Sequence, residues 1–330
     1  MARLHFLPPT EQVYESYAPS RYYGYPLSGY FAERFTYLKE QEWILRIQAG
    51  MITVNGRKEP PDYILKEHDR IVTCMGLRVE PPANRSLEIL YEDERVRVFN
   101  KAAPIPIHPS GRYFKNSMTE LLKDVYPGEV PRPVQRLDVI TTGVLVFART
   151  RPAAAFLMNE FARNRVEKEY LAIVEGVPRD RKFTIDAPIG KIEGSARGVG
   201  ENALNPKPAE TGVEWLGALD GRSLVKAVPR SGRTNQIRVH LASVGLPVLN
   251  DPVYGRRGGV SPRIVPPRAC AEAALPPEVS PAALWTESPV LQYGLHARRL
   301  RFRCFDDCME IAAPWPEHFQ PFIDAAGINP

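Results

Sequence analysis

The chain has 330 residues, a hydrophobic fraction of 44%, a charged fraction of 25% and a net charge of +5. These values are typical of a soluble globular protein of two or three domains, and the mild excess of basic residues permits an anionic partner. They argue against a membrane protein, because no run reaches the ~18 apolar residues of a spanning helix. Residues 1–9 also lack the apolar run of a signal peptide.

The cysteines are few and scattered, which predicts a reduced, cytoplasmic protein with free thiols. They are Cys74, Cys270, Cys304 and Cys308. Cys304 and Cys308 lie close in sequence, but a zinc site needs two more ligands, and no second Cys/His pair has suitable spacing. We therefore expect no metal site.

The first part of the chain predicts an arm followed by a small domain. Residues 1–28 are rich in Tyr and Pro with little periodicity and predict an extended arm. From Tyr30 to Ile47 apolar residues recur at helical spacing, and Gly50 ends this helix. Short strands are expected at 51–57, 63–65 and 69–72. Residues 29–76 thus predict a small α+β domain.

The remainder predicts a linker at 77–86, which contains two prolines, and a larger domain at 87–330. Strands are expected at 87–91, 96–100, 144–148, 168–174, 214–219, 223–228, 237–240 and 300–305. Helices are expected at 117–126 and 152–164. Many strands with few helices predict an α+β fold with a mixed, mainly antiparallel sheet.

Two stretches are expected to interrupt the larger domain. Residues 193–208 are rich in Gly, Asn and Pro and predict a loop. Residues 256–288 are rich in Pro, Arg and Ala and poor in large apolar side chains, so they can bury little surface and predict a mobile insertion.

The most informative position is Asp138. It follows Arg136-Leu137, and a Thr-Thr-Gly turn leads from it into the apolar run 144–148. This pattern places an acid at the start of a buried strand. Such an acid is either a structural cap or the centre of an active site.

Two further segments carry groups that could act with Asp138. Arg233 and Arg238 follow a Ser-Gly-Arg-Thr turn, and an arginine beside Asp138 would keep the carboxylate ionised and fixed in direction. Lys168 and Tyr170 are two apart on a predicted strand and so share a face, where the tyrosine could stack on a flat ring. The alternatives are a phosphate contact or surface ion pair for the arginines and a half-buried strand position for Tyr170.

Several chemistries lack their signatures. No G-x-S-x-G, P-loop or G-x-G-x-x-G is present, and the six histidines are dispersed. His108 could act as an acid or base, but its His-Pro-Ser-Gly setting favours a turn. A carboxylate, an arginine, a tyrosine and many basic residues remain, without a cofactor signature.

Together these segments resemble RluA-type pseudouridine synthases. Four motifs stand in the family's order between residues 87 and 312: Arg136-Leu137-Asp138 with its Thr-Thr-Gly turn, Lys168-Glu169-Tyr170, the segment 232–255 that contains Arg238, and Leu295-His296-Ala297. The segment 47–56 resembles the αL-type RNA-binding domain, similar to a ribosomal small-subunit protein, that often precedes this catalytic domain.

The resemblance implies a pseudouridine synthase that isomerises uridines in structured RNA, either tRNA or rRNA, without a cofactor. Asp138 would be the nucleophile at C1′ of the ribose or the base that starts an elimination, and sequence does not separate these routes. Arg238 would pair with Asp138, and Tyr170 would stack on the extruded base and assist proton removal at C5.

The resemblance also implies substrate-binding residues. Arg136 would occupy the space that the extruded nucleotide leaves, and Ile237 and Leu295 would line the pocket. Lys168 and Arg233 are the other expected contacts. The small domain and the basic surface would hold the RNA backbone, so salt should weaken binding. We expect a monomer without an obligate protein partner.

Three positions depart from the family's pattern. Gln135 and Asn235 stand where the family usually has His, and Lys101-Ala102-Ala103-Pro104 replaces Lys-Pro-x-Gly. They bear on substrate preference more than on activity. Two alternative hypotheses are a non-catalytic RNA-binding or RNA-folding protein on the same scaffold and an unrelated hydrolase that uses Asp138 and His108.

Overall fold

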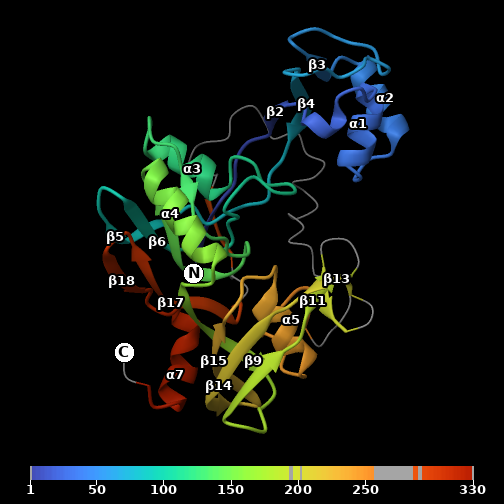
Figure 1. The fold of residues 1–330 in the computed structure, drawn as a ribbon. Coiled ribbons are helices and arrows are strands. Elements are labelled where there is room, and N and C mark those ends of the chain that lie inside the picture. Colours follow the sequence, from blue (N-terminus) through green and yellow to red (C-terminus); the bar gives the residue numbers. More distant parts are fainter. Residues whose placement is uncertain (1, 193–195, 201–202, 256–284, 289–291, 329–330) are drawn as a thin grey trace. The chain divides into compact units, whose positions relative to one another are not determined.

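The computed structural model describes residues 2–192, 196–200, 203–255, 285–288 and 292–328 (Figure 1). The chain divides into two compact units, one of Leu7–Glu80 and one of Met1–Phe6 with Pro81–Pro330. No helix in these described ranges is long and apolar enough to cross a membrane.

The small unit packs two helices on a three-stranded antiparallel sheet of order β2-β4-β3. Its elements are β2 (Thr10–Tyr17), the 3-10 helix η1 (Ser20–Tyr22), α1 (Leu27–Arg34), α2 (Glu40–Gln48), β3 (Ile52–Val54) and β4 (Arg70–Arg78). Trp43, Tyr30 and Phe31 fill the core, with ring centroids 4.8–5.1 Å apart for the pairs that involve Phe31.

Three local predictions for this unit differ from the structure. Residues 63–65, expected as a strand, form only an isolated bridge between Ile64 and Pro26. Residues 10–17, expected in an extended arm, form β2, which pairs with residues 70–78. The partner strand lies far away in sequence, so no local pattern announces this pairing. The single helix expected from Tyr30 to Ile47 is two helices, because the backbone amide of Lys39 donates to Glu42 in a capping box that starts α2.

The large unit is built on one long, mainly antiparallel sheet of order β10-β14-β15-β9-β17-β8-β6-β5, with β18 beside β17 and β7 beside β8. The described strands of this sheet are β5 (Leu87–Glu92), β6 (Val96–Lys101), β7 (Arg132–Pro133), β8 (Thr142–Ala148), β9 (Glu167–Glu175), β10 (Lys182–Asp186), β14 (Glu210–Leu219), β15 (Arg222–Pro229), β17 (Leu295–Cys304) and β18 (Asp307–Ala312). Strands β8 and β17 run parallel at the centre. The predicted α+β class with a mixed, mainly antiparallel sheet is confirmed.

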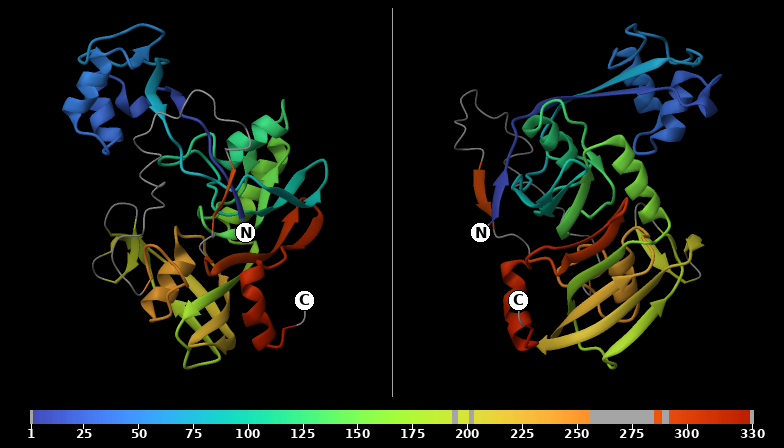
Figure 2. Two further views of the ribbon diagram at one scale, coloured as in Figure 1. Left: turned by 180° about the vertical axis from the view of Figure 1, so that it is seen from behind. Right: turned by 60° about the vertical axis from the view of Figure 1, so that its left-hand side comes forward.

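Helices cover both faces of each half of this sheet (Figures 1 and 2). They are α3 (Met118–Val125), α4 (Arg151–Ala162), α5 (Gln236–Ser243) and α7 (Gln320–Ala325), which follows the 3-10 helix η3 (Glu317–Phe319). Alternate residues of β8 pack against α4 (Val144, Val146) and α3 (Leu145, Phe147). Alternate residues of β9 pack in the same way against the clusters of α5 and α7.

The segment 237–240, predicted as a strand, is helical in the structure. Helix α5 begins after Asn235, whose φ of 58° is left-handed, and residues 236–241 are all buried. The sequence alternates apolar and polar residues from Ile237 to Leu241, which is the period of a strand, but tertiary contacts bury the polar side chains Arg238 and His240 as well and the segment forms a helix. As a helix, α5 places Ile237 and Leu241 on one side, where both pack in the cluster with β9 and β15.

Both stretches expected to interrupt the domain contain strands. Residues 193–208, expected as a loop, include β12 (Arg197–Val199) and β13 (Leu204–Lys207), which flank β11 (Ile189–Lys191) in a small sheet. Of the insertion expected at 256–288, residues 256–284 lie outside the described residues. Its last four residues form β16 (Trp285–Ser288), which pairs with β1 (Ala2–His5).

Candidate active site

Asp138 lies in the turn that leads into β8. The backbone amide of Thr141 donates to the Asp138 carbonyl at 3.1 Å, and β8 begins at Thr142. The Thr142 hydroxyl lies 2.8 Å from Nδ1 of His296 on β17, which ties the turn to the central parallel pair. About 30% of the Asp138 side chain is exposed, so its carboxylate is accessible at the end of a buried strand.

The buried side chain of Lys101 binds the backbone of the Asp138 turn from the protein interior. Its side chain is fully buried, and its Nζ donates to the carbonyls of Val139 (3.1 Å), Thr141 (2.8 Å) and Ala102 (3.0 Å). Burial lowers the pKa of the Lys101 amine to about 7, although the charge of Asp138 acts in the opposite direction. Lys101 therefore bridges carbonyls that flank the Asp138 turn and fixes its path.

Arg238, on α5, binds the Asp138 carboxylate with its Nη1 at 2.8 Å. Its Nε and Nη2 donate to both oxygens of Asp251 at 2.7 and 3.0 Å, and Nη1 also reaches Asn235. Burial by itself would lower the pKa of the guanidinium, but the Asp251 hydrogen bonds and nearby charges outweigh it and raise the pKa. Arg238 thus fixes the direction of Asp138 while being fixed itself.

Asp251 has a structural importance that the sequence reasoning missed. It is buried, accepts from the backbone amides of Val253 and Tyr254, and accepts from the buried hydroxyl of Tyr293 at 3.2 Å. Burial by itself would raise the pKa of the Asp251 carboxyl. The hydrogen bonds from Arg238 and from the two backbone amides have a larger effect, so the pKa lies below its usual value. Its place in an Asp-Pro-x-Tyr-Gly motif was a signal, but the partner of Asp251 is visible only in three dimensions.

Tyr170 and Lys168 approach from β9. Burial, and then the charge of Asp138, raise the pKa of the Tyr170 hydroxyl, so the protonated form is favoured. Nζ of Lys168 donates to the carbonyl of Ser231 at 3.1 Å, and burial lowers the pKa of this amine. Lys168 therefore holds the loop before α5 against β9.

One cavity of about 470 Å³ brings all the predicted site residues together. Its lining includes Asp138, Tyr170, Arg238, Arg136, Lys168, Ile237, Leu295 and Arg233. Arg136 is exposed, and the Nε of exposed Arg233 donates to the carbonyl of Pro208. His108 is exposed and is not among the lining residues, so the structure does not bring it to Asp138 in a shared cavity.

The two positions where the family usually has His also line this cavity. Nε2 of Gln135 donates to the carbonyl of Val144 at 3.1 Å, while its buried Oε1 has no hydrogen-bond partner in the described part of the chain. Asn235 bridges Arg238 and the hydroxyl of Tyr254. Asn235 therefore serves the arginine network, whereas Gln135 keeps an unused acceptor.

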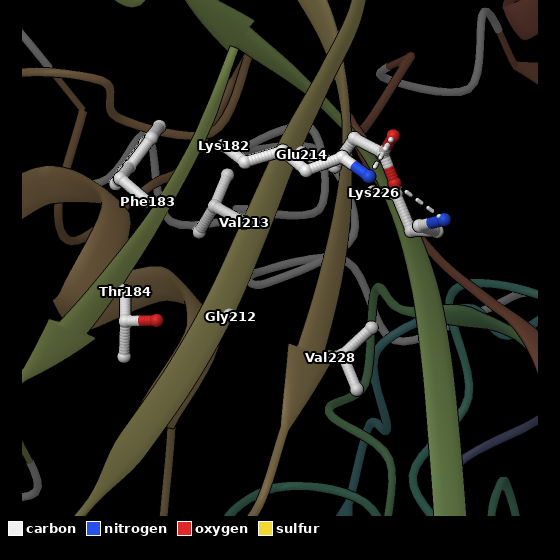
Figure 3. Close-up of a pocket in the computed structure, with 8 residues that line it drawn as sticks. All are labelled: Lys182, Phe183, Thr184, Gly212, Val213, Glu214, Lys226 and Val228. Atoms are coloured by element: carbon white, nitrogen blue, oxygen red, sulfur yellow. Dashed lines mark ion pairs between the residues drawn. The ribbon is translucent and has the colours of Figure 1, made fainter. Parts of the chain in front are cut away.

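A second hollow, of about 330 Å³, lies over β10, β14 and β15 (Figure 3). It exists where Gly212 leaves the sheet without a side chain. Lys182 and Lys226 both pair with Glu214, at 3.1 and 2.6 Å, so their charges are partly compensated. The hollow presents no constellation comparable to that of Asp138, Arg238 and Tyr170, and the larger cavity is the candidate site.

The described residues contain no group of three or more His, Cys, Asp or Glu side chains placed to hold a metal ion. Cys304 is buried and Cys308 is exposed on neighbouring strands, and both are free. The ionisable side chains that line the cavity are one carboxylate (Asp138), three guanidinium groups (Arg136, Arg233 and Arg238), one phenol (Tyr170) and one amine (Lys168).

A model of the RNA pseudouridylate synthase family matches residues 95–243. An RNA pseudouridine synthase of Synechocystis is 30% identical over 69% of this chain and 79% of its own length. RNA pseudouridine synthase 7 of Arabidopsis thaliana is 31% identical over 72% of this chain and 62% of its own length.

The solved structure of human RNA pseudouridylate synthase domain containing 1 has 28% sequence identity and a TM-score of 0.55, and covers 73% of this chain and 88% of that chain. Several curated relatives are considerably longer, since the chain covers only 62%, 47% and 55% of them.

Proposed function

Because the chain belongs to the RluA-type family of RNA pseudouridine synthases, we propose that it isomerises specific uridines of a structured RNA to pseudouridine. The observation that carries this proposal is the ion pair of Asp138 and Arg238, at 2.8 Å, in the cavity that Tyr170 also lines. An accessible carboxylate with a fixed direction is the group that the reaction needs at C1′ of the ribose.

In the proposed reaction the N1–C1′ bond of uridine breaks, the base turns, and a C5–C1′ bond forms. The proton on C5 is lost and N1 gains one, so atoms and electrons balance without a redox partner. Asp138 acts at C1′ as nucleophile or as the base of an elimination, and both routes use the geometry described above. Tyr170 packs against the base, and its raised pKa keeps the hydroxyl protonated as a hydrogen-bond donor, so the C5 proton passes to solvent, from which N1 takes its own proton.

The cavity also supports roles in substrate binding. Ile237 and Leu295 are buried and offer apolar contacts to the base, and Lys168 and Arg233 surround the loop before α5. We propose that Arg136, which is exposed and lines the cavity, occupies the space in the stack that the extruded nucleotide leaves. Extrusion costs a few kcal/mol, which such contacts would offset.

We also propose that the small unit binds the RNA backbone. Five of its basic side chains take part in no ion pair in the described part of the chain; they are Arg34, Lys39, Arg46, Arg57 and Lys58. The RNA itself is a tRNA or an rRNA. One relative is named for position 32 of a tRNA in yeast mitochondria and another for the large ribosomal subunit, so both classes belong in the test.

The test uses total tRNA and rRNA labelled with tritium at uridine C5. The wild-type protein should release tritium, and Asp138→Asn should reduce the rate by about 10³-fold or more, because it removes the reacting carboxylate. Circular dichroism and RNA affinity of Asp138→Asn serve as controls for folding. RNA binding by wild type without tritium release would favour the alternative of a non-catalytic RNA-binding protein.

A further inference from the structure

The cavity extends from the proposed uridine site to a second end beneath helix α4. At the first end, Ile237 and Leu295 pack in the cluster of α5. At the second end, Val134, Leu300 and Phe161 pack in the cluster of α4. Both ends line the same volume of about 470 Å³, so whatever enters at one end has a continuous path to the other.

Helix α4 offers an apolar stripe to this second end. Met158, Phe161 and Ala162 all line the cavity, and their spacing of three and four residues places them on one face of the helix. Met158 is 56% exposed and lines the cavity, so its apolar side chain presents accessible surface there. The stripe is therefore available to a flat apolar group.

Gln135 supplies the polar group of this end. It adjoins Val134, and the bond from its Nε2 to the carbonyl of Val144 anchors the amide on β8. Its Oε1 is buried without a partner in the described ranges, and a buried acceptor left unpaired costs about 1–3 kcal/mol. Because Oε1 has almost no accessible surface, the Gln135 amide must turn toward the cavity that it lines before a ligand can donate a hydrogen bond to Oε1, and that bond would remove this cost.

We propose that this second end, defined by Met158, Phe161, Ala162 and Gln135, is a subsite for the base of a nucleotide next to the target uridine. The proposal rests on the proposed function. When the target base occupies the Asp138 end, the RNA chain must continue from it on both sides, and the adjoining surface of the same cavity is the first that it meets. A nucleobase has an apolar face for α4 and a polar edge for Gln135, and stacking of this kind contributes about 1–3 kcal/mol per base.

The subsite makes Gln135 a specificity-determining residue. Its amide has one acceptor oxygen and an NH2 group, one hydrogen of which is used by Val144. It can thus distinguish the donors and acceptors on the edge of the neighbouring base. The histidine that the family usually has at this position would present a different pattern.

The test is a double-mutant cycle between the protein and the RNA. It uses hairpins with the mapped target uridine that differ only in the 5′ or 3′ neighbour, which is each of the four bases or an abasic residue. An abasic neighbour on one side should lower kcat/KM of the wild type by about tenfold, through lost stacking. In the Met158→Ala variant the abasic neighbour should lower kcat/KM only about threefold, because the methionine side chain that contacts the neighbouring base has already been removed.

Gln135 is tested by the pattern of preference. Gln135→Glu replaces the NH2 group by a second acceptor and should shift the preference away from uracil, the neighbour without an amino group, and Gln135→His should give a third order. Val125→Ala is the control, since Val125 is 47% exposed and does not line the cavity, and it should leave every ratio unchanged. The cycle is repeated with dissociation constants on Asp138→Asn, which needs no catalysis.

Two results separate the failures. The first result is that wild type releases tritium but the effects of Met158→Ala and of the abasic residue on kcat/KM multiply independently, whether the abasic residue is 5′ or 3′ of the target. This result would refute the subsite and leave the proposed function intact. Absence of tritium release from wild type on total tRNA and rRNA, before any hairpin is designed, would refute the proposed function and with it the subsite that rests on it.

Discussion

At the scale of single residues, Arg238 is the centre of the site because it joins two carboxylates of different exposure. Asp138 is 30% exposed and faces the cavity, whereas the Asp251 side chain is fully buried. Because Asp251 is buried and binds Nε and Nη2 of Arg238, the guanidinium keeps its position when substrate or solvent contacts it. Asp251 is thus a positioning residue, since it is not among the lining residues of the cavity.

Asp251→Asn should lower the free energy of unfolding by about 3 kcal/mol or more, because it leaves a buried guanidinium without its bidentate partner. Tyr293→Phe is the matched control, since it removes one hydrogen bond to the same carboxylate and should cost about 1 kcal/mol. Urea unfolding measures both. Tritium release by Asp251→Asn should fall more than its RNA affinity. Equal stability of the two variants would contradict this role of Asp251.

His296 makes stability depend on acidity. Burial lowers the pKa of His296 from 6.5 to about 3. In the unfolded chain His296 therefore takes up a proton as the pH falls below 6.5, whereas in the folded protein it stays neutral down to about pH 3. Unfolding free energy should decrease as the pH falls through this window, with a slope of up to about 1.4 kcal/mol per pH unit from this group.

The variant His296→Asn tests this effect, because asparagine does not titrate and can still bond the Thr142 hydroxyl. Its unfolding free energy, measured in urea between pH 7 and pH 5, should fall less steeply than that of wild type. The buried His240 is present in both proteins, so the difference reports His296 alone. Identical slopes would show that His296 does not resist protonation.

At the scale of elements, the site depends on the close approach of β8 and β17. Gly143, in the Thr-Thr-Gly turn, has a φ of +109°, and a Cβ at this position would lie 2.1 Å from the carbonyl oxygen of Ala297. Only glycine allows this approach and this conformation. Leu295, the first residue of β17, lies two residues before Ala297. The contact between Gly143 and Ala297 therefore also sets the distance between the Asp138 turn and Leu295 in the apolar lining of the cavity.

Gly143→Ala should therefore destabilise the protein by more than about 3 kcal/mol, from backbone strain and the clash with Ala297 together. Gly128→Ala is the control, because Gly128 also has a positive φ, of +90°, but has open space around it. That variant should cost only about 1–2 kcal/mol. The comparison is made by urea unfolding, and equal losses would exclude the clash as the cause.

At the scale of the whole molecule, the division into two units separates the proposed chemistry from the proposed backbone contacts. The cavity belongs entirely to the large unit. The small unit carries exposed Arg57 and Lys58, which have no ion-pair partner in the described residues, and Arg70, which pairs with Glu15 at 2.6 Å. This contrast offers a matched test within one unit.

Arg57→Ala should weaken RNA binding and reduce the slope of log K against log salt concentration by about 0.7–0.9, the value of one phosphate contact. Arg70→Ala should change the slope less, because its charge is already paired. Dissociation constants are measured between 50 and 200 mM salt. The proposed role of the small unit in binding phosphates would be abandoned if the two variants had the same slope as wild type.

The sequence by itself determined the class of fold and selected the residues proposed for the site. Motifs around Asp138, Tyr170 and Arg238 act through residue identity and local turns, so they are visible in one dimension, and all eight predicted residues line one cavity. The many expected strands and few expected helices likewise predicted the mixed, mainly antiparallel sheet.

Only the tertiary structure decided the rest, because it depends on contacts between distant segments. β2 is a strand through its pairing with β4, and α5 is a helix whose residues 236–241 are buried, with its apolar side chains in two different clusters. Asp251 supports the site because Arg238 binds it, although the two residues are thirteen positions apart in sequence. Gln135 gained its proposed role because its Oε1 has no hydrogen-bond partner among the described residues. Hydrogen bonds and packing across such separations are properties of the folded chain, and local sequence patterns do not encode them individually.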